Sequence, residues 1–148
     1  MKTFVSDMPQ FYLKKEKSGF LKARIVSSKD AAEVMRPLFG DDIEFFECFF
    51  MLMLNAANNT IGFVKISQGG MTSTVVDVRL IARYAIESMC TQIIVAHNHP
   101  SGNLYPSEAD KRLTEKIKGG LQLLDIKVLD HIILSSEGFY SFADEGIL

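Results

Sequence analysis

The sequence predicts one three-layer α/β domain in which a mixed sheet lies between helices. Its 148 residues are 47% hydrophobic, with a mean hydropathy of +0.12, which suffices for one compact core. Short apolar segments with strand character alternate along the chain with segments of helical periodicity. The clearest helix has apolar residues at i, i+3, i+4, i+7, i+8 and i+11, namely Val78, Ile81, Ala82, Ala85, Ile86 and Met89.

The first half of the chain is predicted to hold a helix followed by a hairpin. Residues 23–26 are a short strand candidate, and residues 28–39 combine a serine cap, an apolar face and a closing glycine, as a helix does. Residues 45–54 are nearly all apolar, which is typical of a strand covered on both faces. A turn at residues 55–59 then leads to a second strand at residues 61–67, so we expect a hairpin.

The second half repeats the alternation of helix and strand. The helix at residues 78–89 leads to a short apolar strand at residues 93–96. Another helix begins at Ser107, and Gly119-Gly120 weaken it near its end. Its apolar face carries Leu113, Ile117, Leu121 and Leu124. Residues 127–134 and 139–142 complete the sheet as closing strands.

Charge is distributed unevenly over a chain whose net charge is only −2. Residues 1–36 carry eight Lys and Arg against four Asp and Glu, whereas residues 37–148 carry eight against fourteen. We therefore divide the chain into a basic N-terminal arm at residues 1–22 and one domain at residues 23–148. The arm is expected to be solvated and partly mobile, and contact with an acidic partner is the alternative.

The cysteines and the apolar runs indicate the cellular compartment in which the chain is expected. Cys48 and Cys90 lie far apart without a CxxC motif, which excludes a disulfide framework and a thiolate metal cluster and predicts two buried free thiols. The longest apolar run contains Glu47 and is too short to span a bilayer, and no signal peptide is visible. We therefore expect no membrane association and a reducing, cytoplasmic location.

Two of the three histidines, His97 and His99, directly follow an apolar strand, and Asp110 opens the next helix. Side chains two residues apart in an extended strand point to one side, about 7 Å apart, so both imidazoles can reach one ion. Three ligands leave a fourth position for water, as in catalytic zinc sites. Ser107 and Asp110 also resemble a helix capping box, although that motif prefers Glu or Gln at its last position, and this is the alternative to a metal site.

The spacing His97-x-His99, seven residues, Ser107, two residues, Asp110 is the JAMM signature of MPN/JAB-domain metalloproteases. The flanking residues resemble the RadC branch in particular, and the resemblance covers roughly residues 30–148. The segments that carry it are residues 97–102 and 106–110, Leu54-Asn-Ala-Ala-Asn58, Arg79, Leu129-Asp-His-Ile-Ile133 and Tyr140-Ser-Phe-Ala-Asp-Glu-Gly146. The resemblance implies a cytidine-deaminase-like α/β sandwich that holds Zn²⁺ through His97, His99 and Asp110.

The resemblance further implies that Ser107 supports the oxyanion and that an upstream strand glutamate, which maps to Glu47, acts in catalysis. Glu47 stands inside an otherwise apolar run, where a lone carboxylate is costly unless it finds a partner. Exposure on an edge strand is the alternative. Glu44 is the second candidate, but it is predicted to start the strand and to face the opposite side. We expect Glu47 to take a proton from the attacking water and to return it to the leaving amine.

These residues predict a zinc-dependent hydrolase of peptide or isopeptide bonds, acting on a peptide or protein. A DNA-associated RadC-type protein, with a repair or nuclease role, and a non-catalytic metal-binding scaffold are the alternatives. RadC proteins usually carry a helix-hairpin-helix region that this sequence does not contain, and its acidity also weighs against DNA. His131 is left outside the site because a core or surface histidine is more common than one that supports a ligand. Oligomeric state is left open.

Overall fold

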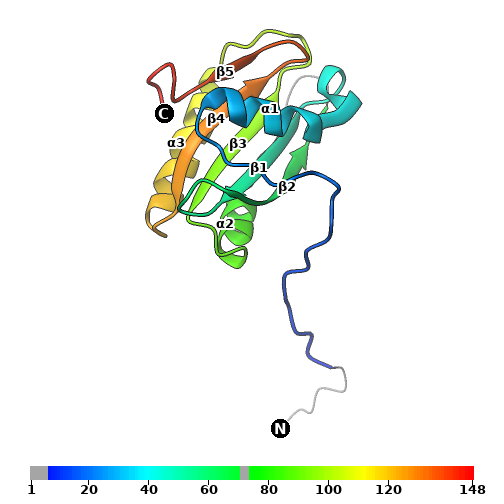
Figure 1. Ribbon diagram of the computed structural model, residues 1–148, viewed down its shortest axis with the longest axis vertical. Coiled ribbons are helices and arrows are strands. Elements are labelled where there is room, and N and C mark those ends of the chain that lie inside the picture. Colours follow the sequence, from blue (N-terminus) through cyan, green and yellow to red (C-terminus); the bar gives the residue numbers. More distant parts are fainter. Residues whose placement is uncertain (1–6, 71–73) are drawn as a thin grey trace.

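A mixed five-stranded sheet with helices on both faces forms the domain (Figure 1). The structure is a computed structural model that describes residues 7–70 and 74–148. The elements in chain order are α1 (Ser28–Phe39), the 3-10 helix η1 (Gly40–Glu44), β1 (Cys48–Leu54), β2 (Thr60–Gln68), α2 (Val78–Glu87), β3 (Gln92–Asn98), α3 (Glu108–Gln122), β4 (Lys127–Leu134) and β5 (Phe139–Ser141).

The strands are ordered β2-β1-β3-β4-β5, and only β3 and β4 run parallel. Helix α3 makes the crossover between these two strands, as parallel neighbours require. The predicted α/β fold with a mixed sheet is therefore confirmed.

The core consists of two apolar layers, one on each face of the sheet. Helix α1 packs on one face, where its Met35 and Phe39 meet Phe50 and Leu52 of β1. Helices α2 and α3 pack on the other face, where Ile81 of α2 and Ile117 of α3 join Phe49 and Met51 of β1 and Val95 of β3 in one cluster. All seven residues of β1 are buried because the strand is central and covered on both faces, which explains its continuous apolar sequence.

Most of the predicted elements lie where the sequence places them. The helix at residues 28–39 and the strand at residues 127–134 have the predicted bounds, and the hairpin of β1 and β2 is present. The helix predicted to reach Met89 ends at Glu87. The strand candidate at residues 23–26 forms only an isolated bridge between Arg24 and Asn59, because it meets the hairpin turn rather than a strand.

The strand predicted to start at Phe45 begins instead at Cys48. Residues 40–44 form η1, which the sequence interpretation missed, and residues 45–46 form a turn in which both phenylalanines are exposed. Asn98 explains the break, because its side-chain amide donates to the carbonyls of Ile43 and Phe46, each at 2.8 Å. The same side chain accepts from the Cys48 N–H at 2.8 Å, so it holds the turn against the first strand residue.

This geometry corrects two expectations about the carboxylates near β1. Glu44 does not start the strand opposite Glu47, because it ends η1. Glu47 directly precedes β1, which lies between β2 and β3, so the alternative of an exposed edge strand is wrong. Glu47 is also buried, with only 9% of its surface exposed.

The described part of the N-terminal arm, residues 7–22, contains no helix or strand and extends away from the domain (Figure 1). Most of its apolar side chains are exposed, as Met8, Phe11 and Leu21 illustrate. Residues 1–6 of the predicted arm lie outside the described residues. Both cysteines are buried free thiols, as predicted. Across residues 7–70 and 74–148, no helix is long and apolar enough to cross a bilayer.

Candidate metal centre

Three elements bring four potential ligands together at one end of the sheet. His97 lies near the end of β3 and His99 directly follows that strand, so the period of two directs both rings to one side. Asp110 lies in the first turn of α3, and Glu47 precedes β1, which pairs with β3. One ligand atom from each of these four residues lies within 4.8 Å of all the others.

The closest contacts join the two histidines and the aspartate. The two Nε2 atoms lie 2.9 Å apart, and His97 Nε2 is 3.4 Å from Asp110 Oδ1. His99 Nε2 is 3.4 Å from Asp110 Oδ2. A tetrahedral zinc ion with ligand distances of about 2.0–2.1 Å separates its ligand atoms by about 3.3 Å. The observed separations therefore match the edges of such a ligand set, although the distance between the nitrogens is somewhat short.

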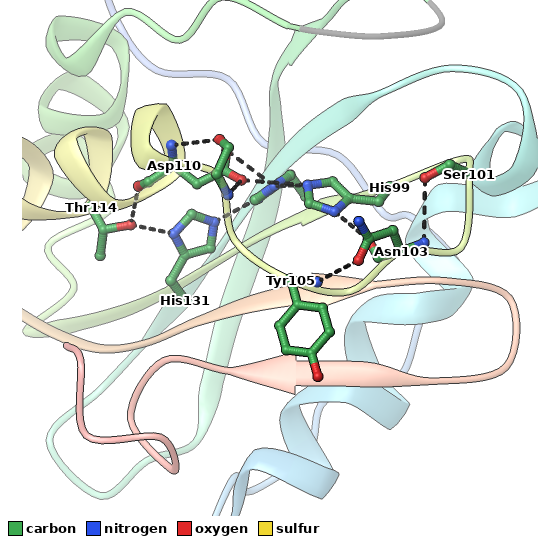
Figure 2. A network of polar contacts seen from close by, with 9 residues as sticks. His99, Ser101, Asn103, Tyr105, Asp110, Thr114 and His131 are labelled. Atoms are coloured by element: carbon green, nitrogen blue, oxygen red, sulfur yellow. Dashed lines mark hydrogen bonds and ion pairs between the residues drawn. The ribbon is translucent and has the colours of Figure 1, made fainter.

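Hydrogen bonding leaves Nε2 of His99 with a lone pair that faces the other potential ligands. The backbone carbonyl of Asn103 lies 2.5 Å from Nδ1 of His99, and a carbonyl only accepts, so Nδ1 carries the proton and Nε2 of the neutral ring does not. Figure 2 shows this contact and the approach of Asp110. Nitrogen lone pairs and carboxylate oxygens that converge in this way repel one another unless a cation or added protons lie between them. The residues present therefore fit a divalent metal ion.

Asp110 is aimed at the histidines by the helix cap that Ser107 begins. The Ser107 Oγ accepts from the Asp110 N–H at 3.0 Å, and the Ser107 N–H donates to Asp110 Oδ2 at 2.9 Å. The capping box considered from the sequence is thus present, with an aspartate in its last position. It is not an alternative to the ligand cluster, because the same capped carboxylate faces both imidazoles.

The charges of these groups shift their pKa values in opposite directions. Burial raises the pKa of Asp110, but its interactions with His97 and His99, each 3.4 Å away, outweigh that effect, so the pKa lies well below its usual range. Burial lowers the pKa of His99, but its bonds to Asp110 and to the Asn103 carbonyl outweigh that effect and raise the pKa. Asp110 is consequently ionised at neutral pH, which suits a ligand for a cation.

Glu47 differs from Asp110 because burial dominates its ionisation. Burial raises the pKa of Glu47, and the attraction of His97 and His99 only partly opposes that rise. Its backbone is held on both sides, since the Glu47 N–H donates to the Gly70 carbonyl and the Gly69 N–H donates to the Glu47 carbonyl. A carboxyl group that is fixed beside the cluster and reluctant to stay charged is suited to exchange a proton.

Ser107 lies at the exposed start of α3. Its oxygen is occupied as a cap acceptor. Within residues 7–70 and 74–148, the hydroxyl proton has no acceptor, so it remains available to a group that approaches the cluster.

His131, which the sequence interpretation left out, contacts His97 through its ring. The His131 side chain is fully buried on β4, and burial holds the pKa of this histidine well below its ordinary value, so the ring is neutral. Its Nε2 is 2.7 Å from His97 Nδ1, and its Nδ1 is 2.6 Å from Thr114 Oγ1. His131 is thus a hydrogen-bonded core histidine, as expected, and it also supports a ligand.

Sequence reasoning missed Thr114 and Asn98, although each position carries a usable signal. Thr114 lies four residues after Asp110 in α3, so both side chains share one face of that helix. Asn98 lies between the two histidines in an alternating strand, so its side chain must point to the opposite, buried face.

Comparisons with known proteins agree on the family of this domain. A family model described as the RadC-like JAB domain matches residues 25–147. A UPF0758 protein of Flavobacterium johnsoniae is 47% identical over 124 residues, which cover 84% of this chain and 53% of that protein. A UPF0758 protein of Porphyromonas gingivalis is 38% identical, with 84% of this chain and 54% of that protein covered.

The UPF0758 protein YfjY of Escherichia coli is 42% identical over 102 residues, which cover 69% of this chain and 64% of that protein. The chain thus spans about half the length of the first two relatives and less than two thirds of the third.

Proposed function

This chain belongs to the RadC-like JAB domain family, and on that premise we propose that it is a zinc-dependent hydrolase of peptide or isopeptide bonds. The JAB/MPN family includes hydrolases. The observation that carries the proposal is the convergence of two imidazoles, an ionised aspartate and a buried glutamate. The raised pKa of Glu47 suits a group that exchanges protons better than it suits a permanently ionised fourth ligand.

His97, His99 and Asp110 would hold the ion through two nitrogens and a carboxylate, a ligand set that suits zinc. When bound, zinc lowers the pKa of a water molecule to about 7 and polarises a carbonyl group. Three protein ligands leave one position open for this chemistry.

Glu47 and Ser107 would supply the remaining steps. Glu47 accepts the proton of the attacking water and then returns it to the amine that leaves. Its raised pKa suits this role, because the group must be stable both with and without the proton. The Ser107 hydroxyl would donate a hydrogen bond to the carbonyl oxygen as negative charge develops there. The capping bond of the Ser107 oxygen fixes its position without using that proton.

The test uses the full chain loaded with zinc and a library of proteome-derived peptides. A second library carries Gly-Gly on lysine side chains as an isopeptide probe. New peptide ends are detected by mass spectrometry, and bound metal is measured by elemental analysis. We expect about one zinc ion per chain, cleavage in at least one library, and loss of cleavage on chelation.

Glu47→Gln is the decisive variant. It should bind zinc as the original chain does and lose cleavage by about 100-fold or more, because general acid–base catalysis contributes roughly 10²–10⁴-fold. Glu44→Gln is the matched control, since Glu44 lies exposed at the end of η1, and it should retain activity. Full turnover by zinc-loaded Glu47→Gln would remove Glu47 as the base. A zinc-loaded original chain that cleaves neither library would refute the hydrolase.

A further inference from the structure

We propose that Thr114 and His131 are positioning residues that fix the proton of His97 on Nδ1, so that its Nε2 lone pair faces the metal. The inference rests on the proposed metal centre and adds two residues that act on a ligand from behind. The two residues belong to a line of hydrogen bonds that runs from the candidate ligand Asp110 to the candidate ligand His97, and Figure 2 shows its Thr114 and His131.

The contacts form a continuous line through the interior of the domain. The Thr114 hydroxyl donates to the backbone carbonyl of Asp110 at 2.7 Å. The same oxygen lies 2.6 Å from His131 Nδ1, and His131 Nε2 lies 2.7 Å from His97 Nδ1. Thr114 and His131 are 3% and 0% exposed, so water does not compete for these bonds.

The hydrogen bonds of this line can be donated in one of two directions, here called its polarities. Only one polarity leaves a lone pair on His97 Nε2 for a metal ion. In the first, the hydroxyl donates to the Asp110 carbonyl, so its oxygen accepts from His131 Nδ1–H, and His131 Nε2 accepts from His97 Nδ1–H. His97 Nε2 then carries a lone pair. In the second, the hydroxyl donates to His131 Nδ1, every proton shifts by one position, and His97 Nε2 is protonated and cannot bind a metal.

The Asp110 carbonyl selects the first polarity. A carbonyl oxygen cannot donate, so the second polarity leaves two oxygens 2.7 Å apart with no proton between them, which is repulsive. Buried polar groups gain most when every member of their network is satisfied, and the first polarity achieves this. Asp110 therefore contributes a carboxylate to the cluster and, through its backbone, orients the His97 ring.

The test compares threonine variants of the full chain. Thr114→Val keeps the shape of the side chain but removes the hydroxyl, and partners that orient metal ligands are worth about 10–100-fold in metal affinity. We expect zinc affinity, measured by competition with a chelator, to fall by about 10-fold or more. The absorption spectrum of bound Co²⁺ should also change. Thr114→Ser retains a hydroxyl and should restore both.

Thr60→Val is the matched control. Thr60 is also buried, and its Oγ1 accepts from the Ala23 N–H at 2.9 Å, but it pairs with Leu54 at the end of β1 remote from the cluster. It should lower stability without lowering zinc affinity. The proposal is wrong if Thr114→Val binds zinc like the original chain, or if Thr60→Val loses as much affinity.

A second measurement needs no variant. Nitrogen-15 NMR of the metal-free original chain should show the ring protons of His97 and His131 on Nδ1, with Nε2 unprotonated. Protons on Nε2 of either ring would overturn the proposal. If the original chain binds no zinc, the proposed function fails, whereas these ring protons still decide the polarity of the line.

Discussion

Asp110 combines structural and chemical roles within one residue. Its N–H and one carboxylate oxygen close the cap of α3, its backbone carbonyl anchors Thr114, and both carboxylate oxygens face the histidines. Each of these bonds restricts the same side chain, so the carboxylate is held in place before any ion arrives. Preorganisation of this kind lets more of the ligand–ion attraction appear as affinity.

Glu47 yields a prediction at the same scale about pH and stability. Because burial raises its pKa in the folded chain, its contribution to stability is greatest below the unfolded value of about 4.3. That contribution is lost as pH rises through the higher folded value. At pH 7 the burial of Glu47 therefore costs the metal-free chain stability.

Glu47→Gln removes that cost, so the metal-free variant should resist denaturant better than the original chain at pH 7. The advantage should shrink as the pH is lowered below about 4. Urea unfolding of both chains across this range measures the difference, and exposed Glu44→Gln should show no such pH dependence. The raised pKa of Glu47 would be contradicted if the stability advantage of Glu47→Gln over the original chain were smaller at pH 7 than at pH 3.5.

At the scale of elements, the end of β3 and the start of α3 bring the candidate ligands together. Helix α3 begins with a capping box whose Asp110 belongs to the candidate ligand cluster, whereas α1 begins with a similar cap whose Asp30 does not. In α1 the Ser27 Oγ accepts from the Asp30 N–H at 3.1 Å, and the Asp30 carboxylate accepts from the Val26 N–H. The chain therefore offers two exposed serine caps of similar form, only one of which aims a ligand.

Ser107→Ala and Ser27→Ala should each lower the free energy of unfolding by about 1 kcal/mol, because each removes a helix cap. Only Ser107→Ala should also weaken zinc binding, since a frayed first turn lets the Asp110 carboxylate move. Urea unfolding and chelator competition provide the two measurements. Equal zinc affinity in both variants would mean that the Ser107 N–H alone suffices to aim Asp110.

At the scale of the whole molecule, metal binding should stabilise the fold, because the candidate ligands come from three segments of the chain. The ligand cluster joins the loop before β1, the end of β3 and the start of α3, which are separated by up to 63 residues from Glu47 to Asp110. An ion that binds only the folded chain stabilises it by mass action, and an excess of 100-fold over Kd contributes about 2.7 kcal/mol.

For a chain of this length, that stabilisation corresponds to a rise in Tm of roughly 5–10 °C. Zinc should produce this shift in the original chain, and chelation should reverse it, as followed by calorimetry. His99→Ala removes one ligand from a partly exposed position and should abolish most of the shift. A shift of the same size in His99→Ala would place the bound zinc elsewhere on the chain.

The order of the elements could be predicted from local patterns in the sequence. The period of α2 and the apolar run of β1 are sufficient to predict a helix and a buried strand, because side-chain burial follows backbone geometry. The two histidines and Asp110 are predictable for the same reason, since the fourteen residues from His97 to Asp110 contain only a strand end, a loop and a helix start. Local spacing therefore sufficed for the fold class and for three candidate ligands.

Contacts between distant segments required the tertiary structure. The start of β1 depends on Asn98, fifty residues later, whose amide satisfies the backbone of the turn before the strand. The support of His97 depends on His131 from β4 and Thr114 from α3, which meet only when β3 and β4 pair across that helix. Sequence alone determined the types of the candidate ligands and their spacing. Burial and hydrogen-bond partners decided their protonation, because both depend on which segments pack together in the folded chain.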